Sequence, residues 1–596
     1  MIPSIASRGW RLAIAGALAL TSIALPTTVA AAPAECAPIL PLNNIHAGQI
    51  GTGWTVNRGS VPKQFRVEVL GVLDDGIAPG RDMVVIEVSD SPGNTFIEDA
   101  GGIWSGMSGS PVYINGKLAG AVAYGFSSAT SPVGGMTPAQ GMAQILDYSA
   151  AAAADTAEPA GNRVRVPQAM RSDLAARAGL TEAQASSFSR LPVPIAVSGV
   201  PSRGLDRLEE SLERQGLNVI MTSGSRAGAP GGAMDEPVPG GNFAAVLSYG
   251  DVTAGGIGTT TYVCGEQALA FGHPLQFRGR SAYGANDANA ITIFADPVFG
   301  SFKLANITDP FGTVDQDRLL GLRAALGDAP DLIPIQARVS SSDTGNDRTG
   351  RSRSTMDDFV PDVGFLQLLT SIDLAVDHGA APGTARLRWT VSGHRQNGNP
   401  WSYTNQNRIA SQLDISFDSA ARLAEELFAI QTNPYENISF ESVEARIWVE
   451  DVVKQNTIEQ VLISRNGGTF RERDFMVLAP GDQLRLRVKL REAPSGALLT
   501  RTLTLNVPGD AFGEAFLVVQ GGGDRDPDPC AFFPGAGCEG GFLGQIEALD
   551  SQPRADTLNA RLESFDFENP EIIASVDSSM DRATYGSFGI GVSIEP

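Results

Sequence analysis

Most apolar stretches of this chain are short, and their apolar residues alternate with polar ones. Examples are FRVEVLGV, DMVVIEVSD, ARLRWTVSG and QLRLRVKL, with glycine- and proline-rich turns between such runs. Alternation with a period of two is typical of strands that bury one face. The pattern predicts a mainly β protein built from barrels or sandwiches.

Two segments follow a helical period instead. DSAARLAEELFAIQ and GLDRLEESLERQGL repeat apolar residues at helical spacing. In the second segment Leu208 and Leu212 share one face, and the acidic side chains of Glu209, Glu210 and Glu213 are typical of a solvated face. This region is therefore predicted to be a small α/β insert.

Changes of composition divide the chain into modules. With 596 residues the chain is too long for one core, because a domain usually spans about 100–200 residues. Polar, glycine- and proline-rich stretches such as AAAADTAEPAGN and GGGDRDPDP mark boundaries. We expect a β-rich module at 38–148, a linker and small α/β insert at 149–235, a second β-rich module at 236–335, a mixed α/β-rich C-terminal module at 336–435, a β-sandwich-like module at 436–520 and a C-terminal tail at 521–596.

The N-terminal segment is organised like a secretory signal. Arg8 and Arg11 precede an apolar run, and small residues follow it. This pattern predicts a signal peptide at 1–31 and export of the mature protein to the periplasm or the cell exterior. No later run approaches the roughly 20 apolar residues of a spanning helix, so we expect no membrane span in the mature chain.

The charge of the chain limits its partners. The net charge is −22 and the isoelectric point is near 4.7. Nucleic-acid binding relies on clustered lysine and arginine, so we expect no nucleic-acid partner. The acidity mainly favours solubility.

Four cysteines would reach an oxidising compartment after export. Cys530 and Cys538, in CAFFPGAGC, could close a short loop, which leaves Cys36 and Cys264 as a possible long-range pair. Zinc binding is not expected, because the chain has no CxxC and no paired His-Cys spacing.

A second possible metal site lies in DRDPDPC. Asp524, Asp526 and Asp528 alternate there like the oxygen ligands of calcium. The interleaved prolines and the missing glycine and distal glutamate favour a solvated linker instead. We therefore expect no metal and no cofactor.

The turn GMSGSP has the composition of a nucleophile turn. A serine becomes a nucleophile when a base removes its proton and when N–H groups await the oxyanion. Ser108 would be the reactive residue, the N–H groups of Gly106 and Ser108 would form the oxyanion hole, and Ser110 would be structural. The alternative is an ordinary hairpin turn, in which glycine and serine are common.

A base must come from only four histidines. His273, in QALAFGHPLQFRG, ends an apolar strand, which is a good position for a base. A satisfied structural histidine is the alternative, and His46 is a second candidate base. We expect His378 and His394 to be surface residues.

Both turns lie in longer motifs that resemble a known family. GGIWSGMSGSPVYINGKLAGAVAYG resembles the serine motif of the SpoIVB-type serine peptidases, and GGIGTTTYVCGEQALAFGHP resembles their histidine segment. The matches cover roughly 43–145 and 236–330. The resemblance implies a chymotrypsin-like double β-barrel, with its halves at 38–148 and 236–335, and a Ser-His-Asp triad in which Ser108 is the nucleophile and His273 the base.

The resemblance also implies the acid of the triad. In the family it lies on a strand before the Gly-Gly-Ile segment, and Asp90, in IEVSD, matches that setting best. Asp99 and Asp251 are alternatives. The chain departs from the best-known members because its serine motif precedes its histidine motif and no PDZ segment is recognisable. Chain order does not exclude a triad, which is defined by geometry.

Two functions follow from these patterns. The first is a secreted or periplasmic serine endopeptidase that acts on polypeptides, with its own chain as one candidate substrate. The second is a non-catalytic envelope or binding protein that keeps the peptidase barrel as a scaffold, because a fold does not guarantee an activity. The distance between Ser108 and His273 discriminates between them.

Overall fold

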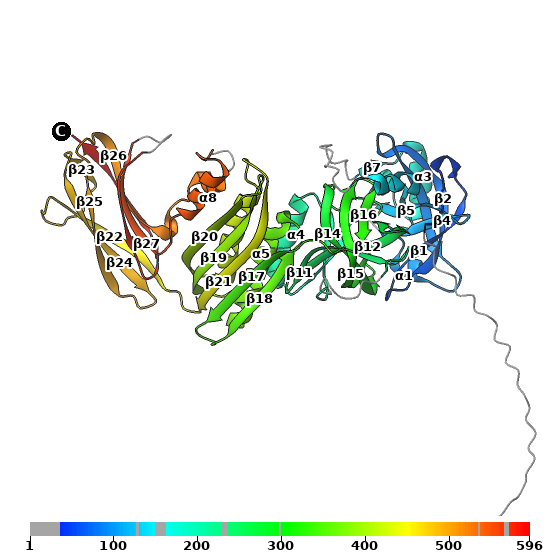
Figure 1. Cartoon of the computed structure of the whole chain (residues 1–596), viewed down its shortest axis with the longest axis horizontal. Coiled ribbons are helices and arrows are strands. Elements are labelled where there is room, and N and C mark those ends of the chain that lie inside the picture. The colour runs from blue at the N-terminus through cyan, green and yellow to red at the C-terminus, as the bar shows by residue number, and fades with distance from the viewer. Residues whose placement is uncertain are drawn as a thin grey trace, which may run out of the picture.

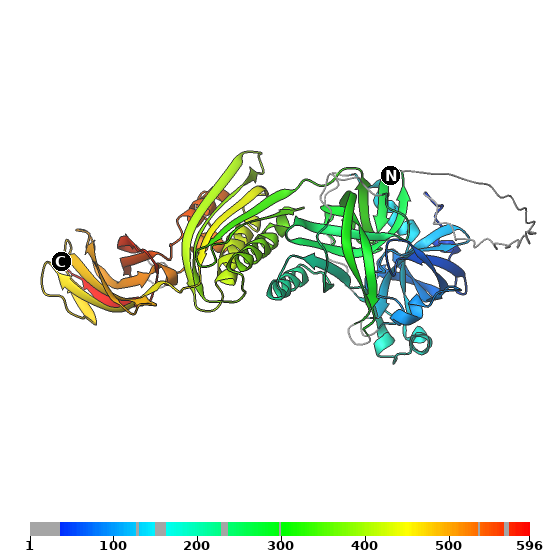
Figure 2. The ribbon, with the colours of Figure 1, turned by 90° about the horizontal axis from the view of Figure 1, so that it is seen from below.

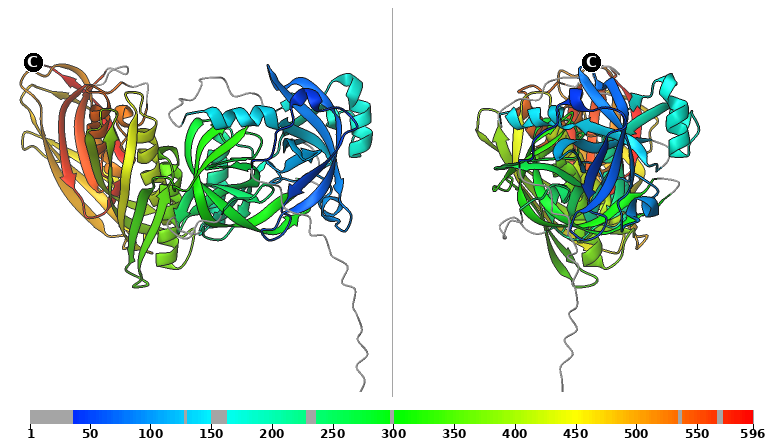
Figure 3. Two further views of the ribbon diagram at one scale, coloured as in Figure 1. Left: turned by 45° about the vertical axis from the view of Figure 1, so that its right-hand side comes forward. Right: turned by 90° about the vertical axis from the view of Figure 1, so that its right-hand side faces the viewer.

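The structure, a computed structural model, describes residues 36–126, 130–149, 163–227, 236–296, 300–533, 537–565 and 571–595. The predicted signal peptide at 1–31 lies outside these residues. Strands dominate, which confirms the prediction of a mainly β protein. Figures 1 and 3 show two barrels at one end, a sheet with helices in the middle and a two-sheet module at the C-terminal end.

The first barrel is a closed ring of six antiparallel strands. In ring order they are β1 (Ile50–Thr55), β2 (Lys63–Ala78), β3 (Arg81–Asp90), β6 (Val133–Pro138), β5 (Lys117–Phe126) and β4 (Pro111–Ile114), which pairs with β1. The FRVEV run of β2 alternates as its sequence predicts. Phe65, Val67 and Val69 are fully buried, whereas Arg66 and Glu68 between them are not.

The second barrel closes in the same way. Its ring consists of β11 (Asn242–Gly250), β12 (Thr253–Cys264), β13 (Gln267–Ala270), β16 (Gly321–Leu326), β15 (Phe302–Arg318) and β14 (Gly279–Phe294), and β14 pairs with β11. Every neighbouring pair in this ring is antiparallel. The two rings form the double β-barrel that the resemblance implied.

The segment predicted as an α/β insert at 149–235 is divided between the two barrels. The strands β7 (Arg163–Arg165) and β8 (Ser187–Arg190) extend the first sheet from β5, and β9 (Val193–Ser198) and β10 (Val219–Ser223) extend the second from β12. The helices are α3 (Gln168–Ala178) and α4 (Ser202–Arg214). The segment does not stand alone because Phe188 enters the core of the first barrel, and Leu208 and Leu212 enter that of the second.

The middle module is a five-stranded continuation of the second sheet, with two helices on one face (Figure 2). Its strands are β18 (Asp347–Ser354), β17 (Ile333–Ser341), β21 (Ile438–Glu450), β19 (Gly383–Arg395) and β20 (Pro400–Ser411), and its helices are α5 (Val360–Val376) and α6 (Ile415–Gln431). Because β21 pairs with β17 and β19, the mixed module extends past the predicted boundary at 435. Among the described residues one helix, Asp357–Val376, is long and apolar enough to cross a membrane, but 83% of it is buried inside the protein.

The C-terminal module is a sandwich of two sheets. One contains β25 (Leu498–Asn506), β24 (Gln483–Ala493), β22 (Gln455–Arg465) and β29 (Ala583–Tyr585), and the other β23 (Phe475–Leu478), β30 (Ser587–Ile594), β26 (Gly513–Gly521), β27 (Thr557–Ser564) and β28 (Ile572–Ser579). The segment expected as a tail at 521–596 therefore completes the sandwich. The physical reason is burial, because Leu558, Ala560 and Leu562 of β27 are fully buried in its core.

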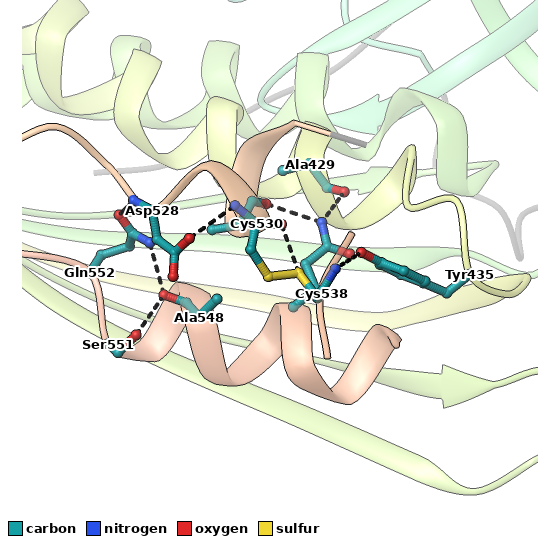
Figure 4. The surroundings of a disulfide bond; sticks show 10 residues. Ala429, Tyr435, Asp528, Cys530, Cys538, Ala548, Ser551 and Gln552 are labelled. Carbon is teal, nitrogen blue, oxygen red and sulfur yellow. Dashed lines mark hydrogen bonds between the residues drawn. A yellow bond between two sulfur atoms is a disulfide. The ribbon is translucent and has the colours of Figure 1, made fainter. Parts of the chain in front are cut away.

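Two disulfides join the four cysteines. Cys36–Cys264 links the N-terminal end of the described chain to the end of β12, so it ties the two barrels together. Cys530–Cys538 closes the short loop that the spacing predicted (Figure 4). Around this loop lie the helices α7 (Pro529–Phe532) and α8 (Phe542–Asp550), and the Cys538 N–H donates to the Tyr435 hydroxyl of the middle module.

Two of the three aspartates of DRDPDPC accept hydrogen bonds from backbone N–H groups. Asp528 caps α7 by accepting a hydrogen bond from the Cys530 N–H at 2.9 Å, as Figure 4 shows. Asp524 accepts one from the Gly586 N–H. Within the part of the chain that the structure describes, no group of three histidine, cysteine or acidic side chains is arranged to hold a metal ion.

Candidate active site

Ser108 lies in a tight turn that leads into β4. The Met107 N–H donates to the Trp104 carbonyl, and the Ser110 N–H donates to the Met107 carbonyl, so two turns follow each other directly. Gly109 has a φ of +94°, and a Cβ on it would lie 2.0 Å from the Thr259 carbonyl oxygen. No side chain fits there, which explains the glycine after the serine.

Threonines of the second barrel hold this serine turn. The Thr259 N–H donates to the Ser108 carbonyl at 2.8 Å, and the Thr259 hydroxyl donates to the Gly106 carbonyl at 3.2 Å. The Thr261 hydroxyl donates to the Gly109 carbonyl at 2.7 Å. Both threonines are buried on β12. The conformation of the serine turn in the first barrel therefore depends on the second barrel.

The histidine turn is held in a reciprocal way. It follows β13 with two residues of positive φ, Phe271 at 68° and Gly272 at 69°. The Thr137 hydroxyl of the first barrel donates to the Gly272 carbonyl at 2.6 Å. On the far side of the turn, the buried Asp317 carboxylate accepts hydrogen bonds from the N–H groups of Leu275 and Gln276 at 2.9 and 2.7 Å.

These two turns place Ser108 and His273 in contact. The Ser108 Oγ lies 2.9 Å from the His273 Nε2, and the His273 Nδ1 lies 2.8 Å from the Pro274 carbonyl oxygen. A carbonyl oxygen only accepts, so the hydrogen-bond network assigns the imidazole proton to Nδ1. Nε2 is then the acceptor for the Ser108 hydroxyl, which is the arrangement of a nucleophile and its general base.

Burial sets the protonation state of the His273 imidazole. Desolvation lowers the pKa of His273 to about 4, the hydrogen bond to the Pro274 carbonyl raises it in part, and the nearby Arg190 charge lowers it. The imidazole is therefore neutral at pH 7, which is the form that can take the serine proton.

Asp90 lies away from the imidazole, contrary to the expectation from the motif. Its two carboxylate oxygens accept hydrogen bonds from the N–H groups of Ile97 and Glu98, both at 2.9 Å. These donors belong to the first turn of α1 (Phe96–Ala100), whose N–H groups have no partner within the helix. Asp90 therefore caps α1, and the Pro274 carbonyl occupies the position at Nδ1.

The two alternative acids are also engaged elsewhere. Asp99 accepts a hydrogen bond from the Thr95 hydroxyl at 2.9 Å. Asp251 pairs with Arg226 and accepts a hydrogen bond from the Arg351 N–H at 2.9 Å. In the described residues, no carboxylate forms a hydrogen bond or an ion pair with His273.

Two N–H groups of the serine turn are available for an oxyanion. Met107 and Gly109 donate to the Trp104 and Val122 carbonyls. The alternating N–H groups, those of Gly106 and Ser108, donate to no acceptor in the part of the chain that is described. A pair of unengaged N–H groups beside a nucleophile is the composition of an oxyanion hole.

The other histidines lie outside this site. His46 and His394 are exposed, and His378 pairs with Asp451 at 3.3 Å. Ser110 has a buried hydroxyl that forms no hydrogen bond within the described residues, so its contribution to the turn comes from its backbone.

Four further residues of the site were not singled out from the sequence. They are Thr259, Thr261, Asp317 and the buried Lys303. Lys303 packs closely against the serine turn, because a Cβ added to Gly106 would lie only 2.8 Å from the Lys303 Cβ. The Lys303 Nζ donates to Asn242 Oδ1 at 3.1 Å, and burial lowers the pKa of this lysine to about 7. The threonine pair had a sequence signal, because a spacing of two in GIGTTTYV places both on one face of a strand.

The comparisons with known proteins agree with the first motif. Residues 24–137 match the family model of the SpoIVB peptidase S55, which supports the resemblance seen in the sequence. The matched region contains Ser108 and ends before His273, and it covers well under half of the chain. No curated protein and no solved structure matches the chain.

The buried imidazole predicts how stability changes with pH. The unfolded chain binds a proton at His273 below about pH 6.5, whereas the folded chain does so only near pH 4. The stability that the neutral imidazole contributes is therefore complete above pH 6.5 and decreases as the pH falls toward 4, by about 3 kcal/mol in total.

Urea unfolding of the wild-type protein and of His273→Gln between pH 4 and 8 measures this effect. The free energy of unfolding of the wild type should fall more steeply below pH 6.5 than that of the variant. Parallel curves for the two proteins would contradict a buried neutral imidazole.

Proposed function

We propose that this protein is a serine peptidase that cleaves polypeptides through a Ser108–His273 dyad. The contact of 2.9 Å between the Ser108 Oγ and the His273 Nε2 carries this proposal. The family match over residues 24–137 supports it at the level of the reaction class. The alternative function, a non-catalytic scaffold, does not require a contact between the side chains of Ser108 and His273.

The geometry supports acyl transfer to the serine. The Ser108 Oγ attacks the carbonyl carbon of a peptide bond while its proton moves to the His273 Nε2. The N–H groups of Gly106 and Ser108 bind the oxyanion of the tetrahedral intermediate. The imidazolium then gives its proton to the leaving amine, the C–N bond breaks, and a water molecule releases the acyl group from Ser108 by the reverse sequence.

In this proposal the Pro274 carbonyl takes the orienting role that an acid has in a catalytic triad. It fixes the tautomer and the orientation of the ring through Nδ1, at 2.8 Å. Because it is neutral, it stabilises the imidazolium less than a carboxylate would. The site is therefore proposed to be a dyad.

We also propose that the enzyme acts outside the cytoplasm. The signal-like segment at 1–31 and the two disulfides support export, since structural disulfides form in oxidising compartments.

Labelling by a fluorophosphonate tests the nucleophile. We expect covalent modification at Ser108 of the wild-type protein, mapped by mass spectrometry of its peptides. Ser108→Ala and His273→Ala should lower the labelling rate by at least about a thousandfold, because one loses the nucleophile and the other loses the base. Ser110→Ala is the matched control and should keep the label. A label that persists in Ser108→Ala, or a wild-type protein that never reacts, would contradict the proposal.

Asp90→Asn tests the absence of a triad acid at Asp90. A carboxylate that orients the catalytic imidazole is worth about 10⁴-fold in rate when it is changed to an amide. Because Asp90 caps α1, we expect Asp90→Asn to change the labelling rate of Ser108 by less than about threefold and to cost about 1 kcal/mol of stability. A loss of a thousandfold in a folded variant would place Asp90 in the catalytic machinery.

A further inference from the structure

The reactive atoms of the proposed dyad are closed off from solvent. Ser108 and His273 are each only 1% exposed. Acyl transfer requires a peptide carbonyl within contact distance of the Ser108 Oγ, with room for its flanking residues. A polypeptide substrate therefore has no path to the nucleophile in this conformation.

A short stretch of chain crosses between the barrels at this point. Residues 190–194, called the crossing segment below, run from the last residue of β8 to the first two residues of β9. β8 pairs antiparallel with β5 of the first barrel, and β9 pairs antiparallel with β12 of the second. The Leu191 N–H donates to the Ala123 carbonyl at 3.0 Å, and the Val193 N–H donates to the Asn218 carbonyl at 2.8 Å.

The crossing segment lies against the serine turn, and its first residue is close enough to the base for its charge to act on it. At one end the Arg190 charge acts on His273. At the other end the Pro194 ring borders the serine turn, because a Cβ on Gly106 would lie 3.4 Å from Pro194 Cγ. The segment therefore runs from Arg190, whose charge acts on His273, to Pro194, which lies beside Gly106. The N–H group of Gly106 is one of the two that are proposed to bind the oxyanion.

The apolar side chains of the crossing segment anchor it in both cores. Leu191 is 6% exposed and packs in the same cluster as Met107, the residue before the nucleophile. Val193 is 5% exposed and belongs to the cluster of Leu275, which lies two residues after the base. Both anchors are almost fully buried, so apolar burial holds the cover in place.

We infer that the crossing segment occupies the substrate cleft as an internal cover, so that the enzyme is latent until the segment moves. This inference rests on the proposed function. The segment leaves a strand that is paired with β5 of the first barrel and enters a strand that is paired with β12 of the second, so it lies where a polypeptide added between the barrels would lie. Four of its five residues are apolar, so the segment also points to a polypeptide with mainly apolar residues at the cleavage site as the substrate class.

The sequence of the cover makes two of its peptide bonds resistant to cleavage. The bonds Leu191–Pro192 and Val193–Pro194 both end in proline. A proline nitrogen carries no N–H and is enclosed in a ring, which leaves little room for an imidazole to deliver a proton to it. Two of the bonds in the cover are therefore poor sites for acyl transfer.

Labelling rates of matched variants test the cover. Val193→Ala removes an anchor of the crossing segment, and Val164→Ala makes the same change at an equally buried site on β7. We expect Val193→Ala and Leu191→Ala to raise the fluorophosphonate labelling rate of Ser108 at least tenfold, and Val164→Ala to leave it within twofold of the wild type. Equal rates in all four proteins would overturn the cover while leaving the nucleophile established. If none of the four reacts, the proposed function fails, and the cover fails with it.

Amide hydrogen exchange of the wild-type protein gives a second test that needs no substitution. The Leu191 and Val193 amides should exchange slowly before reaction, because both are hydrogen bonded. After complete reaction of Ser108 with a fluorophosphonate that carries a long biotin linker, we expect their exchange to be at least tenfold faster. Unchanged protection in the fully reacted protein would overturn the inference, even if Val193→Ala does not fold.

Discussion

The hydrogen bond between the Ser108 Oγ and the His273 Nε2 is the interaction on which the rest of this account depends. It joins side chains that are 165 positions apart and belong to different barrels. Each turn is fixed from the opposite side, the serine turn by Thr259 and Thr261 and the histidine turn by Thr137. The disulfide Cys36–Cys264 adds a covalent link between the same two barrels. The site is therefore a property of the barrel interface and of neither barrel alone.

Burial gives this interface two opposite properties. It keeps the imidazole neutral and holds the donor and acceptor in register, which favours proton transfer from the serine. It also separates the Ser108 hydroxyl from any polypeptide, since both side chains are almost fully buried. This combination fits the proposed latency, because little rearrangement of Ser108 and His273 would be needed if the crossing segment moved.

The sequence indicated the barrels and the pairing of Ser108 with His273, but not the surroundings of these two side chains. Alternating strands such as FRVEV and the glycine-flanked Ser108 and His273 turns are local signals, so they could be read without a structure. The partner of the His273 Nδ1 could not be predicted from the sequence, because it is a backbone carbonyl. The motif IEVSD gives no help, since an aspartate that orients an imidazole and one that caps a helix can have the same neighbours in sequence. The prediction of a C-terminal tail at 521–596 differs from the structure for another reason. The alternation of TLNARLES is clear, but it lies beyond a glycine- and proline-rich stretch, and its strand pairs with β26, far back along the chain.

A crystal structure of the protein after reaction with a fluorophosphonate tests the central claim most directly. The account predicts a phosphorus atom bonded to the Ser108 Oγ, a phosphonyl oxygen within hydrogen-bond distance of the N–H groups of Gly106 and Ser108, and the His273 ring still bonded to the Pro274 carbonyl through Nδ1. An adduct on another residue, or a phosphonyl oxygen directed away from both N–H groups, would contradict it.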